Sequence, residues 1–196
     1  MKYFFNRLYR LLFCRGGFGV HSPFVFDLIT NVIEETTPFY CYDLLRAKRS
    51  QLKHDGRKLL LKEHDCRLLM RLANRFHASR ILAYADHSGE VSLYTTAHSS
   101  TAQCDVSQNP DKGACYDILY IDFKSFNVNT FESLLRHVDK NSLLIIDGIK
   151  SSPDHKLAWQ KVCRHPLPTV KIDLYTLGLV FFDTQLPNLT RKGVVL

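Results

Sequence analysis

The sequence predicts an α/β fold: a doubly wound, mostly parallel sheet with an antiparallel pair at its C-terminal end and a helical cap at its N-terminal end. Three segments, "RILAYA", "YDILYID" and "SLLIIDG", are apolar on both faces, which is typical of parallel strands that helices cover on each side. A segment with helical spacing, "NVNTFESLLRHV", lies between the second and the third. The chain closes with "TVKIDLYTLGLVFFD", two β-rich runs that meet near Gly178 and favour an antiparallel pair.

The first part of the chain, residues 1–76, predicts the helical cap. Its apolar side chains recur three or four positions apart, as on one face of a helix. Ser22 followed by Pro23 marks a helix start, because a serine oxygen caps free amide groups and proline suits the first helical position. Pro38 and Gly56 mark breaks between helices.

The rest of the chain, residues 77–196, predicts the sheet. We expect strands near 80–85, 116–121 and 142–147 to be adjacent and parallel. A further helix, "SPDHKLAWQKVC", precedes the closing strands. The side chains that we expect in one core are Ile81, Ile118, Leu119, Leu144, Ile145 and Phe181.

Length and composition indicate one compact unit in a reducing compartment. At 196 residues and 45% hydrophobic content, the chain suffices for one well-buried domain and is short for two. No apolar run approaches the roughly 20 residues that cross a bilayer, and polar residues interrupt the opening "MKYFFNRLYRLLFCRGG". The six cysteines are scattered without a CxxC pair. We therefore expect a cytoplasmic protein with reduced, mostly buried thiols.

The formal net charge of +7 raises the question of a nucleic-acid partner. The densest basic run, "RAKRSQLKHDGRK", has no aromatic side chains interleaved to stack on bases, so a solvated helix face is the simpler interpretation. We expect no nucleic-acid binding. The segment "YFFNRLYRLLF" has the pattern of a membrane-surface helix, but a helix of this kind more often packs on its own domain.

Polar residues that follow the predicted strands are the candidate site. Asp86, Asp122 and Asp147 each come directly after a strand, and ligands bind at the carboxyl ends of strands in such sheets. One such acid often caps the next turn, whereas three at one edge indicate a cleft. We expect "GVHSPF", from Gly19, to fold over these strand ends. His21 then either faces the cleft or ties down its own loop.

Several of these segments resemble a known family. "YDILYIDF", "NSLLIIDGI", the "AW" helix and "HPLPTVKIDLYTLGLVFF" resemble the second half of class I S-adenosylmethionine (SAM)-dependent methyltransferases, and "GVHSPFVFDLIT" is similar to an early segment of a small O-methyltransferase-like group. The resemblance implies a Rossmann-like fold, SAM as cofactor and a small-molecule methyl acceptor. It makes Asp122, Asp147 and His21 the candidate catalytic residues.

The loop after the first strand departs from the family. Its pattern resembles E-x-G-x-x-x-G, and the aligned positions here are Ala83, Ala85 and Gly89. An alanine Cβ costs roughly 1 kcal/mol where the backbone needs a positive φ, and it fills the space through which the cofactor approaches. The acid that would face the cofactor's cationic end is missing at Ala83, although Asp86 could replace it.

The chain is also shorter than the family pattern. Only "STAQCDVSQNPDKGAC" precedes the strand at Tyr116, so "AQCDV" is the candidate second strand, with Asp105 as the ribose-binding acid, and no third strand follows. Loss of a strand at the sheet edge leaves the central ladder intact. The cofactor-binding candidates are therefore Ala83, Ala85, Asp86, Gly89 and Asp105.

A metal site is not expected. Asp122 and Asp147 match two strand-end acids of metal-dependent relatives, but Gly148 and Ser125 stand where those relatives have further ligands. Two isolated carboxylates make a poor divalent site.

Two functions remain open. The chain is either an active methyltransferase with an altered cofactor loop, or a truncated and degenerate member that keeps the scaffold for binding or assembly, because a fold does not by itself carry an activity. The departures favour weak or lost SAM binding.

Overall fold

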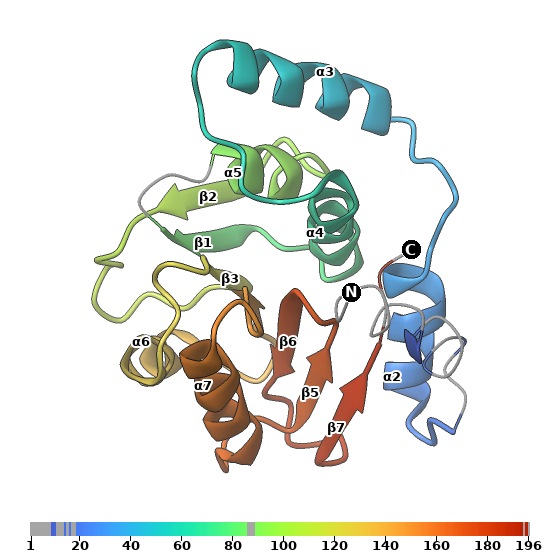
Figure 1. Cartoon of the computed structure of the whole chain (residues 1–196), viewed down its shortest axis with the longest axis vertical. Helices are drawn as coiled ribbons and strands as arrows, with labels where there is room; N and C mark the ends of the chain where they lie inside the picture. The colour runs from blue at the N-terminus through green and yellow to red at the C-terminus, as the bar shows by residue number, and fades with distance from the viewer. Residues whose placement is uncertain are drawn as a thin grey trace.

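The structure is a computed structural model that describes residues 9–10, 14, 16, 19–85, 89–193 and 195. A seven-stranded sheet forms its centre, in the order β2-β1-β3-β4-β6-β5-β7 (Figure 1). The strands are β1 (Arg80–Tyr84), β2 (Gln103–Val106), β3 (Ile118–Ile121), β4 (Leu143–Asp147), β5 (Val170–Asp173), β6 (Leu177–Phe181) and β7 (Leu189–Lys192).

The sheet is mostly parallel, as predicted. Parallel pairs join β1 to β2, β1 to β3, β3 to β4 and β5 to β7. The strand β6 runs antiparallel to both of its neighbours, β4 and β5. The other strands therefore all point the same way, and their carboxyl ends meet at one edge of the sheet.

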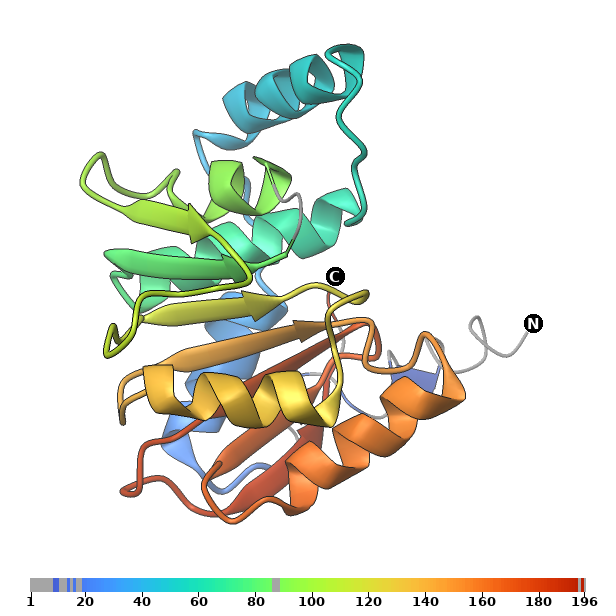
Figure 2. The same cartoon turned by 90° about the vertical axis from the view of Figure 1, so that its left-hand side faces the viewer.

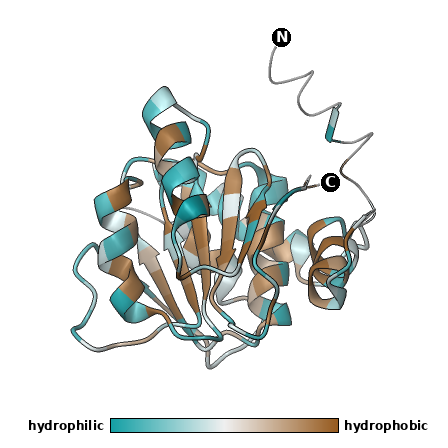
Figure 3. Ribbon diagram, turned by 90° about the horizontal axis from the view of Figure 1, so that it is seen from below, coloured by the Kyte–Doolittle hydropathy of each residue, from teal (hydrophilic) through white to brown (hydrophobic). Residues whose placement is uncertain are grey.

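Helices cover both faces of the sheet, which confirms the doubly wound, Rossmann-like fold. In Figure 2, α6 (Val128–Leu134) and α7 (Pro153–Arg164) lie in front of the strands, and α2 (Pro23–Leu28) and α4 (Glu63–Arg75) lie behind them. Figure 3 shows the strands mainly brown, between helices that carry teal on their outer sides. The remaining helical elements are η1 (Ile29–Ile33), α3 (Tyr42–His54), α5 (Gly89–Thr95) and η2 (Leu135–His137).

The buried side chains form two clusters, so the expectation of one core is wrong. Ile81, Ile118, Ile145 and Phe181 pack with α2 to α5 in what we call the α4-side cluster. Leu119 and Leu144 pack with α6 and α7 in the α7-side cluster. The reason is that successive side chains of a strand point to opposite faces, and both faces are covered.

The N-terminal helices cover the sheet directly. Leu68, Leu69 and Leu72 of α4 are fully buried in the α4-side cluster. The predicted helix start is confirmed, since Pro23 is the first residue of α2 and the Ser22 Oγ accepts a hydrogen bond from the Val25 amide. No helix in the described ranges has both the length and the apolar composition needed to cross a membrane.

The two edge strands of the sheet are β2 and β7. At one edge, β2 pairs only with β1 within the described part of the chain, and a loop leads directly to β3. At the other edge, β7 adds a strand parallel to β5 that the sequence did not predict. Its residues alternate between half-buried and exposed, so it lacks the two-sided apolar signal of the central strands.

Candidate functional site

Two predicted acids lie where the adjacent strands β3 and β4 end: Asp122 directly follows β3, and Asp147 is the last residue of β4. Asp122 is 4% exposed and Asp147 is 9% exposed. The Asp122 Oδ1 accepts a hydrogen bond from the Ser125 amide at 2.7 Å, which closes a turn. The Tyr120 hydroxyl donates to the Asp147 Oδ2 at 3.3 Å. The structure therefore brings these two carboxylates to the same buried edge.

Asp147 has an unusual electrostatic environment. Burial is the main cause that raises its pKa to about 7, and the negative charges of Asp65 and Asp122 act in the same direction. Burial and Asp147 also raise the pKa of Tyr120 well above its usual value. A carboxyl group that exchanges its proton near neutral pH at a strand end is suited to general acid–base work.

Asp65 is a buried acid of this edge that sequence reasoning missed. It lies in the first turn of α4, whose N-terminal end faces the strand ends, and its Oδ1 is 3.4 Å from the His64 Nε2. An acid in the first turn of a helix ordinarily complements the helix dipole. Its sequence position therefore gave no signal that Asp65 would face Asp147.

Glu90 is a second acid that the sequence did not single out, and its contacts are structural. Its Oε1 accepts hydrogen bonds from the Leu60 and Leu61 amides, and its Oε2 lies 3.2 Å from the Arg49 Nε. These contacts fasten the segment before α4 to the start of α5.

The predicted cofactor-loop residues are largely enclosed. Ala83 is 0% exposed within the α4-side cluster, and Ala85 is 2% exposed. Gly89 begins α5 without a positive φ, and an added Cβ would meet only the Leu52 methyl groups at 3.8 Å. Asp86 falls outside the described residues. Ala83 and Ala85 therefore have little open space beside them, whereas Gly89 is exposed.

Asp105 lies on the edge strand β2. It pairs with Leu82 in the β1–β2 register, one position before the last residue of β2. Its side chain is exposed and hydrogen-bonds the Tyr116 hydroxyl. The acid therefore faces a neighbouring tyrosine on the α7 side of the sheet.

At Gly148, directly after Asp147, the backbone cannot carry a side chain that would act as a further metal ligand. Its φ is +70°, and an added Cβ would lie 2.5 Å from the Phe123 Cβ, so the backbone there has no room for a side chain. Within the ranges that the structure describes, no three His, Cys, Asp or Glu side chains gather as a metal-binding group.

The end of the "GVHSPF" segment lies at the amino ends of the parallel strands, opposite the carboxyl ends that carry Asp122 and Asp147. The Phe24 ring is 5.3 Å from the ring of Phe181, which pairs with Leu143, the first residue of β4. The expectation that this segment walls the cleft at the carboxyl ends is wrong for Phe24, whose half-buried ring packs at the amino ends. His21 is exposed there, and we do not propose a catalytic role for it.

Cavities of about 570 and 530 Å³ lie at two places away from Asp122 and Asp147. One, of 570 Å³, extends from Tyr84 at the end of β1 along the loop 108–113 to Leu134 and His137 beside α6. The other, of 530 Å³, lies beside α7. The first is close to the end of β1, where the cofactor loop begins.

The fold is shared with solved methyltransferase structures. A methyltransferase from Geobacter sulfurreducens is 15% identical with a TM-score of 0.56, and the match covers 82% of this chain and 96% of that chain. An O-methyltransferase from Bacillus cereus in complex with SAH is 12% identical with a TM-score of 0.52, covering 80% and 96%.

A third example is the O-methyltransferase TomG from Streptomyces achromogenes in complex with SAM, which is 11% identical with a TM-score of 0.51, covering 81% of this chain and 94% of that chain. No family model and no curated protein matches the sequence. At these identities the similarity shows the fold alone.

Proposed function

We propose that this chain is a diverged class I SAM-dependent methyltransferase that binds SAM weakly or not at all and has kept the scaffold for another use. The shared fold and the sequence resemblance in "YDILYIDF" and "NSLLIIDGI" support its descent. The end of the sheet at β2 carries the proposal. In the family, a further strand lies beyond this position and frames the adenine, whereas here β2 is the edge of the described sheet.

The loop after β1 has lost a second set of contacts that would bind SAM. Ala83 and Ala85 replace an acid and a glycine, and both are buried. If each of the two losses removes about 1 to 3 kcal/mol of binding free energy, and the two are roughly additive, affinity falls about 30-fold to well over a thousandfold. A micromolar site would then become a millimolar one.

Active methyl transfer is the second candidate function. The buried Asp147 favours it, because a carboxyl group with a pKa of about 7 can act as a general acid or base near neutral pH. In that case a small hydroxylated molecule would be the methyl acceptor.

Isothermal titration with S-adenosylhomocysteine (SAH) separates the two candidates. We expect a dissociation constant above about 100 μM for this chain. The Bacillus cereus O-methyltransferase, which has been solved with SAH, serves as the positive control under the same conditions. A dissociation constant below about 10 μM would contradict the proposal and favour the active enzyme.

The variant Ala85→Gly tests how much of the loss comes from the loop. It restores the loop glycine without placing a charge in the apolar cluster, as Ala83→Glu would. Because the missing strand remains missing, we expect SAH affinity to rise by no more than about tenfold. Full recovery to micromolar affinity would show that the strand is unimportant.

A further inference from the structure

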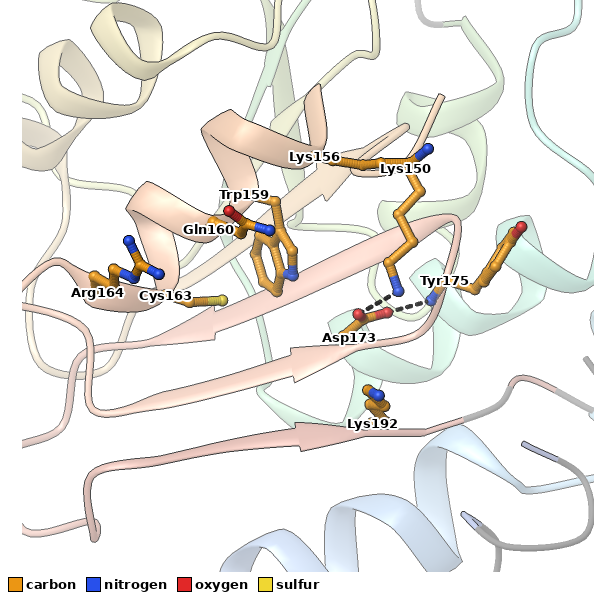
Figure 4. Close-up of a pocket in the computed structure, with 9 residues that line it drawn as sticks. All are labelled: Lys150, Lys156, Trp159, Gln160, Cys163, Arg164, Asp173, Tyr175 and Lys192. Atoms are coloured by element: carbon orange, nitrogen blue, oxygen red, sulfur yellow. Dashed lines mark hydrogen bonds and ion pairs between the residues drawn. The ribbon is translucent and has the colours of Figure 1, made fainter. Parts of the chain in front are cut away.

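A groove beside α7 forms a second candidate binding site, far from the cofactor region. It has a volume of about 530 Å³, which is within the range of small-molecule pockets. We call it the α7 groove, and Figure 4 shows it between α7 and the ends of β5 and β7. The residues that define it are Lys150, Lys156, Trp159, Arg164, Asp173 and Lys192.

The single carboxylate of the α7 groove is already neutralised. Asp173 is buried at the end of β5, and its Oδ1 lies 2.8 Å from the Arg10 Nη2. Its Oδ2 accepts a hydrogen bond from the Lys150 Nζ. Lys192 pairs with Asp173 in the β5–β7 register and brings a third cation to this point. Three positive charges and one negative charge therefore meet here.

Further positive charge lies along the groove. Within the described part of the chain, Lys156, Arg164 and Lys192 form no ion pair. Burial lowers the pKa of Lys150, and the charges of Arg10 and Lys192 lower it further, although Asp173 acts in the opposite direction. These contributions indicate that Lys150 lies in electropositive surroundings.

Aromatic side chains fix the position of Lys150. Its Nζ lies 5.2 Å from the centroid of the Tyr175 ring, within cation–π distance, while it bonds Asp173. Trp159 forms the wall on the α7 side and packs closely on β6, because an added Cβ at Gly178 would lie only 2.6 Å from its ring. Lys150 is thus held in place before any ligand arrives, which reduces the entropy cost of binding.

We propose that the α7 groove binds a small molecule that bears phosphate groups, with Lys150 and Lys192 near Asp173 and Lys156 on the α7 side as its cationic contacts. Ammonium groups bind phosphate oxygens through charge-assisted hydrogen bonds, and Arg164, at the other end of the groove in Figure 4, can contact a second anionic group. The strands β3, β4 and β6 separate β5 from β1, which corresponds to roughly 19 Å at about 4.8 Å per strand. Asp173, at the end of β5, therefore lies away from the end of β1, where the cofactor loop begins.

The only tryptophan of the chain, Trp159, provides the assay. Titration of the full chain with inorganic pyrophosphate, at ionic strength held constant with KCl, should change its fluorescence in a saturable way, with a dissociation constant below about 1 mM. The double variant Lys156→Gln with Lys192→Gln should weaken binding at least tenfold. Circular dichroism should show that this variant, changed only at exposed positions, remains folded.

A matched control removes the same charge elsewhere. Lys48→Gln with Lys53→Gln changes two exposed lysines of α3, and we expect the pyrophosphate dissociation constant to stay within about twofold. An equal loss in both double variants would show a general charge effect and overturn the proposal, as would the absence of saturable change. An excess of SAH should leave pyrophosphate binding unchanged, and displacement would contradict a separate site.

Discussion

At the end of β4, Asp147 carries a carboxylate whose charged form both burial and the neighbouring acids disfavour. Its pKa in the folded chain is about 7, against an ordinary value of 3.8. Between these two values the folded state binds a proton that the unfolded state has released. Stability therefore falls as the pH rises from about 4 to 7 and is level above that range.

Asp147→Asn should remove this loss. The asparagine cannot ionise, and its side-chain oxygen can still accept the Tyr120 hydrogen bond. We expect the variant to exceed the wild type in free energy of unfolding by about 1 to 3 kcal/mol at pH 8, and the difference to shrink towards pH 5. Urea denaturation at both pH values measures it.

Asp111→Asn is the matched control, because it removes a carboxylate from an exposed loop position. Its effect on stability should be small and similar at both pH values. If Asp147→Asn were destabilising at pH 8, Asp147 would be needed in its charged form, and the interpretation of its environment would be wrong.

Some residues of this edge were predictable and others were not. Asp122 and Asp147 could be identified because each follows a run that is apolar on both faces, and such runs end at one edge of a parallel sheet. Asp65 could not, because it approaches Asp147 only when α4 packs on the sheet, and Tyr120 could not, because its hydrogen bond depends on the register of β3 and β4. For His21, the sequence resemblance did not show whether it lies at the amino or the carboxyl ends of the strands.

At the scale of elements, the strands were predictable where both faces are buried. β1, β3 and β4 showed this pattern, whereas β7, which is half-exposed at the edge, did not. The same pattern did not reveal that the sheet separates two clusters. In a run that is apolar on both faces, the sequence does not show which helices the side chains of each face contact.

Double-mutant cycles should reveal the two clusters. Leu144→Ala should cost about 2 to 5 kcal/mol of unfolding free energy. Combined with Leu119→Val, its partner in the β3–β4 register on the same face, it should show a coupling of at least about 0.5 kcal/mol. Combined with Ile118→Val, on the opposite face, the effects should add within about 0.5 kcal/mol.

Each of the two partner substitutions shortens one buried aliphatic side chain, so the comparison isolates the face on which the side chain lies. Equal coupling in both cycles would contradict the division into two clusters. A cost for Leu144→Ala below about 0.5 kcal/mol would contradict its burial.

At the scale of the whole molecule, the helices before residue 77 and the sheet after it form a shared interior. Ile29, Ile33 and Leu69 from the first part are fully buried beside Ile118 and Ile145 from the second. The predicted boundary at residue 76 therefore marks a change of pattern in the sequence, and we propose that it does not divide two independently folding units.

A fragment of residues 77–196 should fail to fold cooperatively. It lacks α4, so one face of its central strands would be exposed to water. We expect the full chain to unfold in one transition by circular dichroism in urea, and the fragment to show neither a sigmoidal transition nor a near-ultraviolet signal. A cooperative transition of the isolated fragment would show instead that the first 76 residues are a separable cap.

The hydrogen bond between Arg10 and the Gly193 carbonyl, 2.9 Å long, joins positions that are 183 residues apart. A ribosome that adds about 5 to 20 residues per second takes roughly 10 to 40 s to make that span. Until that span has been made, the Arg10 guanidinium has no Gly193 carbonyl to bind. Docking of this arginine is therefore a step that can begin only after Gly193 has been made, when the central strands have had time to assemble.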